Sequence, residues 1–140
     1  MKRNIRYLFI LLTIILIFGG YQYFKHAGLR AYRYVGQSEV QLDSLANGRY
    51  HGVFSPFKVI HLARVKFSIE EGKVTDFTIP RLLVSPWNKV KPAIEDTVQT
   101  KRSFHFDAIT GATRSTYFIK AAIHKACETE AVAREKQEKP

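Results

Sequence analysis

The fold of this chain is organised around a stretch near its C-terminal end, Asp107-Ala108-Ile109-Thr110-Gly111-Ala112-Thr113-Arg114-Ser115-Thr116. Apolar residues alternate in the short segment before it, residues 103–106, and they recur at helical spacing after it, from residue 117 to about 133. This order predicts a strand, a tight turn and then a helix.

The turn contains residue types that can build an anion site at the start of a helix. The hydroxyl of Thr110 can cap the helix, and Gly111 lets the backbone approach a bound group because it has no Cβ. Free N–H groups in the first helical turn and the positive end of the helix dipole then attract an anion. Thr113 places a hydroxyl on that turn and Arg114 offers a second positive contact, although a capped helix without any ligand is the simpler alternative.

The residue inventory argues against metal and disulfide chemistry. Cys127 is the single cysteine, which excludes an internal disulfide and any site built on a pair of cysteines. The 5 histidines do not occur at the spacings of common metal-binding motifs, and no serine has the surroundings of a hydrolase nucleophile. We therefore predict no metal site and no catalytic residue.

The positive charge of the chain is spread along its length. The net charge is +10, but the lysines and arginines form neither a dense cluster nor a recognition-helix pattern. Several of them flank the apolar N-terminal segment, as is common beside membranes. We therefore expect no binding to nucleic acid.

Residues 1–24 are predicted to be a membrane anchor. The run of residues 7–24 contains no charged residue and lies between Arg6 and Lys25, which is long enough to cross a bilayer as a slightly short helix. Tyr21, Tyr23 and Phe24 are placed to form an aromatic belt at the interface. A cleaved signal peptide is the alternative, but no clear cleavage site follows the run.

Residues 25–43 are predicted to be a stalk between the anchor and the domain. The helix is expected to continue to about Tyr34 before Gly36 ends it. Basic residues lie on both sides of the apolar run, so the positive-inside rule does not decide the orientation of the anchor.

Residues 44–130 are predicted to form an α+β domain in which a small antiparallel sheet packs against helices. Val90, Ile94 and Val98 share one face of a helix over residues 90–100, and the last helix has a small apolar face that suits close approach to a sheet. The tail, residues 131–140, is charged and expected to be flexible. The expected strands cover residues 49–54, 59–69 and 74–83, with a turn at residues 70–73, and a further strand covers residues 103–106.

The segment from Asp107 to Thr113 resembles the flavinylation motif of the FMN-binding domain family. That family includes the C subunit of the sodium-translocating NADH:quinone oxidoreductase and the G subunit of the Rnf complex. Its motif has Asp, a small residue, any residue, Ser or Thr, and then Gly-Ala-Thr before a helix, and this chain matches each position. Upstream, the phrase of residues 47–52, Asn-Gly-Arg-Tyr-His-Gly, is similar to the family's Asp-Gly-x-Tyr-x-Gly opening, with Asn47 in place of Asp.

The resemblance implies that Thr113 carries FMN, joined through the threonine Oγ to the phosphate by a flavin transferase. The implied cofactor contacts are Asp107, Thr110, Gly111, Ala112, Arg114, Ser115 and Thr116. It also implies that the domain lies outside the cytoplasm, so the chain is expected to be a single-pass protein of the cell membrane with a cytoplasmic N-terminus.

The resemblance favours an electron carrier over a complete enzyme, because the chain has no dinucleotide-binding motif and no iron–sulfur cysteines. The expected partners are the transferase, the membrane and a membrane or extracytoplasmic redox protein. Two alternatives stay open: a membrane-anchored adaptor with this fold and no flavin, and a reductase domain that holds FMN without a covalent bond.

Overall fold

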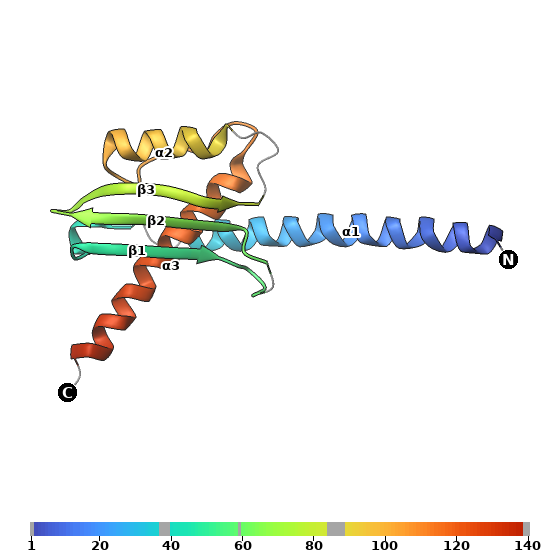
Figure 1. Cartoon of the computed structure of the whole chain (residues 1–140), viewed down its shortest axis with the longest axis horizontal. Helices are drawn as coiled ribbons and strands as arrows, with labels where there is room; N and C mark the ends of the chain where they lie inside the picture. The colour runs from blue at the N-terminus through green and yellow to red at the C-terminus, as the bar shows by residue number, and fades with distance from the viewer. Residues whose placement is uncertain (1, 37–39, 59, 84–88, 139–140) are drawn as a thin grey trace.

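The computed structural model describes residues 2–36, 40–58, 60–83 and 89–138 (Figure 1). It has three helices longer than one turn and a three-stranded antiparallel sheet, which confirms the predicted α+β class. The elements follow in the order α1 (Lys2–Val35), the short 3-10 helix η1 (Leu42–Ser44), β1 (Gly48–Phe54), β2 (Ala63–Glu70), β3 (Lys73–Leu82), α2 (Val90–Lys101) and α3 (Thr113–Glu138).

The sheet has the strand order β1-β2-β3, so consecutive strands are neighbours. Alternate side chains of each strand point to opposite faces, and this alternation buries one face of the sheet. The tight turn between β2 and β3 has left-handed backbone at Glu71 and Gly72, with φ of 51° and 71°. The predicted alternation in β2 is confirmed, since its buried members are Ala63, Val65, Phe67 and Ile69.

Helix α3 passes across the buried face of the sheet, as Figure 1 shows. The approach is closest at Gly52 in β1, where an added Cβ would lie 1.9 Å from the carbonyl oxygen of Ala122 and 2.9 Å from Cβ of Ala126. Small residues on both elements permit this contact, as the small apolar face of the last helix predicted. Gly52 is therefore required by packing.

Helix α2 runs along β3 and covers that edge of the sheet (Figure 1). Its apolar face is the predicted one, because Val90, Ile94 and Val98 are all buried. Two polar side chains one turn apart bind the backbone of β3: Glu95 Oε1 accepts from the N–H of Ile79 at 2.6 Å, and Gln99 Nε2 donates to the carbonyl of Phe77 at 3.0 Å. They satisfy groups that an unpaired strand edge would leave free.

The first part of α1 extends away from the domain, and its last turns pack against α3. Ala27 and Ala31 have no exposed surface, and the ring of Tyr32 contacts that of Tyr117 edge to face at 5.2 Å. The helix ends where Gly36 was expected to end it, since the N–H of Gly36 bonds the carbonyl of Tyr32 at 2.9 Å. Part of the predicted stalk thus packs against α3 through Ala27 and Ala31, whereas most other side chains of residues 25–35 are exposed.

The strand predicted at residues 103–106 is wrong, because these residues form an irregular connection between α2 and α3. The N–H of Phe106 bonds the carbonyl of Phe104 at 3.1 Å, which bends the backbone too tightly for a strand. The ring centres of Phe104 and Phe67 are 4.8 Å apart, and Phe106 is buried. Phe104 and Phe106 therefore both face the core from a loop. Beyond them, α3 remains helical to Glu138, further than the predicted end near residue 133.

Candidate functional site

The start of α3 is held in place by the buried hydroxyl of Thr116. Its Oγ1 accepts a hydrogen bond from the N–H of Ile109 at 3.3 Å and donates to the carbonyl of Ala112 at 3.1 Å. The N–H of Ala112 also bonds the carbonyl of Ile109 at 2.8 Å, closing a turn in which Gly111 has a φ of 81°. One side chain therefore fixes the loop against the helix, in a backbone conformation that favours glycine.

Thr113 carries the exposed hydroxyl of the first turn of α3. The next two hydroxyls are buried, since Ser115 is 3% exposed and Thr116 has no exposed surface. The N–H groups of Thr113 and Arg114 lie in the first turn, where no helix carbonyl precedes them. Thr113 therefore combines an exposed side chain with the N-terminal position of α3.

The other motif residues divide into exposed and packed ones. Asp107, Thr110 and Gly111 are exposed, whereas Ala112 is half-buried. Because α3 begins at Thr113, Ala112 occupies the N-cap position, and the capping role that we predicted for Thr110 is wrong. An added Cβ at Gly111 would meet nothing within 4 Å, so the surface above the turn is open.

Arg114 lies against the last turns of α1. An added Cβ at Gly28 would be 3.5 Å from Cγ and 3.6 Å from Cδ of the arginine, so the aliphatic stem of Arg114 crosses α1 at that glycine. The side chain remains exposed overall. Arg114 therefore connects the motif to α1 while keeping its charge in solvent.

A cavity of about 690 Å³ lies beside Asp107. This volume is in the range of small-molecule and cofactor sites. The cavity has apolar walls from Phe104 and Phe106, and polar groups from Lys120 and His124 of α3. Its remaining walls are Val35, Gly36, Val40, Leu42, Asp43, Gly72, Arg102, Ser103, His105, Asp107 and Ile123.

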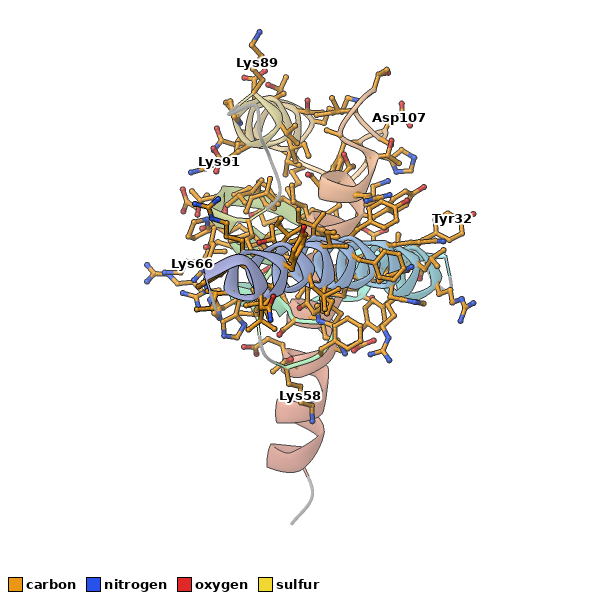
Figure 2. The ribbon with its side chains drawn as sticks, turned by 90° about the vertical axis from the view of Figure 1, so that its right-hand side faces the viewer. Tyr32, Lys58, Lys66, Lys89, Lys91 and Asp107 are labelled. Atoms are coloured by element: carbon orange, nitrogen blue, oxygen red, sulfur yellow. The ribbon has the colours of Figure 1, made fainter. Side chains whose placement is uncertain are left out.

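Thr113 does not line this cavity, but two of the lining residues lie on its side of α3. Lys120 and His124 follow Thr113 by two and three helical turns, so the three residues share one side of the helix to within about 20°. The rise from Thr113 to Lys120 is roughly 10 Å. A ligand attached at Thr113 can therefore extend along α3 into the cavity. Asp107, which lines the cavity, lies on the same side of α1 as Tyr32 (Figure 2).

Burial controls the ionisation of the groups next to the cavity. It lowers the pKa of His124, against the attraction of Glu128, and the positive charge of Lys120 lowers it further. The imidazole is thus kept neutral around neutral pH. Burial also raises the pKa of the Cys127 thiol to about 12, so this cysteine is a poor nucleophile.

The described part of the chain holds no group of three or more His, Cys, Asp or Glu residues that could bind a metal ion. The cavity combines aromatic walls with the basic side chains of Arg102 and Lys120 and the carboxyl groups of Asp43 and Asp107.

Several cavity residues were not predicted from the sequence. Phe104, His105 and Phe106 fall within the strand predicted over residues 103–106, yet all three line the cavity. The i, i+4 spacing of Lys120 and His124 on the side of Thr113 is the signal that could have identified two of the polar members.

Comparison of the chain with models of protein families, with curated proteins and with solved structures finds no match. The likeness to the FMN-binding domain family therefore depends on the motif residues themselves.

Proposed function

We propose that this protein is a membrane-anchored flavoprotein that carries FMN covalently on Thr113 and takes part in electron transfer. The observation that carries the proposal is the geometry of the Asp107–Thr113 motif. Of the three hydroxyls in the first turn of α3, the one at the motif's attachment position is exposed and the other two are buried. Within the first turn of α3, this arrangement leaves Thr113 as the residue whose hydroxyl is open to a modifying enzyme.

The helix start would hold the phosphate of the bound FMN. The N–H groups of Thr113 and Arg114 and the helix dipole would offset its negative charge, and the guanidinium of Arg114 would lie nearby. Attachment requires an activated flavin nucleotide, FAD. The threonine Oγ bonds to phosphorus, the phosphoanhydride bond breaks, AMP leaves, and the hydroxyl proton passes to the transferase.

The cavity along α3 offers a place for the flavin ring. Phe104 and Phe106 would supply apolar and aromatic surface, and Lys120, whose Nζ lies 5.2 Å from the centre of the Phe106 ring, would supply a positive charge. When bound, FMN supplies the electron-transfer chemistry, and the protein supplies position and electrostatics. The neutral imidazole of His124 would contribute a hydrogen-bonding group without a second charge.

Helix α1 is long and apolar enough to cross a membrane. We propose that it anchors the protein in the cell membrane as a single span, with the flavin domain on the extracytoplasmic side. Covalent attachment is useful there because free FMN would diffuse away. The redox partner would be another membrane or extracytoplasmic protein.

Flavin fluorescence on a denaturing gel tests the proposal. The full chain would be co-expressed with a flavin transferase and compared with Thr113→Ala and with Thr100→Ala, which changes an exposed threonine of α2 outside the motif. We expect a fluorescent band for the wild type and for Thr100→Ala, and a dark band for Thr113→Ala. Mass spectrometry of the peptide of residues 103–114 would locate the adduct.

The outcomes separate the alternatives. A dark wild-type band with a competent transferase would contradict covalent attachment. Flavin that purifies with the protein and is released by acid would then favour a reductase domain with non-covalent FMN. A protein without flavin in both assays would favour an adaptor.

A further inference from the structure

The length of the apolar run fixes the position of α1 in a bilayer. Residues 7–24 lie between Arg6 and Lys25 and form a helix of about 27 Å, slightly shorter than the hydrocarbon core of about 30 Å. Because the run is no longer than the hydrocarbon core, a shift along the membrane normal would bury Arg6 or Lys25 in it. Tyr23 and Phe24 must therefore lie at the lipid boundary next to the domain.

The loop after β1 is fastened to α1 beside this boundary. The ring of Phe57 contacts that of Tyr23, with their centroids 4.9 Å apart. Arg30 holds the same loop, since its Nη1 donates to the carbonyl of Pro56 at 2.7 Å and its guanidinium lies 4.5 Å from the Phe57 ring centre. A residue of the globular domain thus touches a residue of the span.

The end of the sheet that adjoins this loop exposes apolar side chains. Ile60 is 37% exposed and Leu83 is 43% exposed, although both are large aliphatic residues. Hydrogen bonds hold their backbones next to the sheet: the N–H of Leu83 donates to the carbonyl of Leu62, and the side-chain hydroxyl of Ser55 donates to the carbonyl of Ile60. In Figure 1, β1 and β3 point toward the side on which α1 leaves the domain.

Two exposed lysines lie close to these apolar residues along the chain, since Lys58 precedes Ile60 by two residues and Lys89 follows Leu83 by six. Figure 2 looks along α1 from its N-terminal side and shows Lys58 and Lys89 extending on opposite sides of the helix. Both side chains are exposed, and no ion pair involves either of them within the described part of the chain. Exposed aliphatic groups together with lysines at the same end of a domain are typical of surfaces that meet the lipid headgroup region.

We infer that this end of the domain, which we call the membrane-facing end (Phe57, Lys58, Ile60, Leu83 and Lys89), lies in the headgroup layer of the bilayer. Its aliphatic side chains reach toward the acyl boundary, and its two ammonium groups bind lipid phosphates. The inference rests on α1 crossing the membrane, as proposed above, and is independent of the flavin. The domain then contacts the membrane in addition to α1, and this second contact fixes its orientation relative to the bilayer.

Spin-label accessibility in the full chain tests this inference. Cys127→Ala removes the single cysteine, and nitroxides are attached at Ile60→Cys, Lys66→Cys and Leu16→Cys in vesicles of zwitterionic and anionic lipid. Collision with oxygen and with a water-soluble nickel chelate reports depth. We expect the label at position 60 to collide several-fold less with nickel than the label at position 66, and the label at position 16 to be almost fully protected.

Equal nickel accessibility at positions 60 and 66 would overturn the inference, and so would free access of nickel to position 16, because the span itself would then be absent. Leu83→Cys gives a second label on the membrane-facing end, at a residue that is 43% exposed, and leaves both lysines in place. Protection that appears only after another membrane protein is added would assign the surface to that protein and not to lipid.

Discussion

The two sequence motifs, residues 47–52 and 107–113, differ in how the fold uses them. In the first, the side chain of Asn47 accepts the N–H of Glu71 at 3.0 Å. The hydroxyl of Tyr50 donates to the carbonyl of Ala46 at 2.7 Å, and its ring is buried. Gly52 allows α3 to approach. Packing and backbone hydrogen bonds account for all three residues.

The second motif is exposed at its polar residues and at Gly111, whereas Tyr50 and Gly52 of the first motif are buried. Asp107, Thr110, Gly111 and Thr113 are all exposed, and no hydrogen bond or ion pair holds the three polar side chains within the described residues. Thr116, outside the core motif, fixes the loop. The φ of Gly111 suits glycine in the turn, whereas the polar side chains of the second motif make few contacts within the chain. Under the proposed function, the transferase and FMN would contact them.

The largest effect is expected from Gly52→Ala. The added methyl group would overlap the carbonyl of Ala122, and neither β1 nor α3 can move without separating the core. We expect the free energy of unfolding to fall by about 3 kcal/mol or more. Urea unfolding of the full chain in detergent, followed by circular dichroism, measures it.

Gly28→Ala is the matched control for that substitution. It adds the same methyl group inside α1, where the nearest atom would be at an ordinary contact distance of 3.5 Å. Its stability should stay within about 1 kcal/mol of the wild type, because alanine is the better helix former. Equal losses in both variants would contradict the packing explanation of the first motif.

An intermediate effect is expected from Thr116→Val. Valine keeps the shape of threonine but removes the hydroxyl that binds Ile109 and Ala112, leaving the N–H of Ile109 without this acceptor. We expect a loss of about 1–3 kcal/mol in the free energy of unfolding. Faster amide hydrogen exchange at Ile109 would show that the loss arises at the loop before α3. Thr116→Ser, which keeps the hydroxyl, should recover most of the loss, and a failure to recover would show that the methyl group matters more.

The smallest effect on stability is expected from Thr113→Val. The side chain is exposed and makes no hydrogen bond within the described structure, so the free energy of unfolding should change by no more than about 0.5 kcal/mol. The same variant should lose flavin completely under the proposed function. If Thr113→Val unfolds the domain instead, the second motif is structural and the contrast with the first disappears.

The sequence predicted the elements whose pattern has only one physical solution. Alternation from Ala63 to Ile69 allows a half-buried strand, and the spacing of Val90, Ile94 and Val98 allows a helix with one apolar face. Alternation over residues 103–106 was too short to distinguish a strand from a loop with two inward aromatic residues, and the loop was found. Ala27 and Ala31 are small residues at helical spacing, and we did not use them to predict that α1 packs on α3.

For the candidate site, the sequence identified Thr113, Gly111 and Asp107 but could not show which hydroxyls are exposed. That depends on how the first turn of α3 faces α1 and the loop, which is a contact between segments far apart in the chain. The cavity has the same origin, since it is bounded by the end of α1, by residues 40–43 and 102–107, and by α3.

By itself, the sequence determined the α+β class, the apolar N-terminal helix and the position of the motif at a helix start, because periodicity and turn chemistry act over a few neighbouring residues. Only the tertiary structure decided that α1 joins the domain core, that Thr116 is buried while Thr113 is exposed, and that a cavity lies along the same side of α3. These features arise from packing between distant segments, which local patterns do not specify.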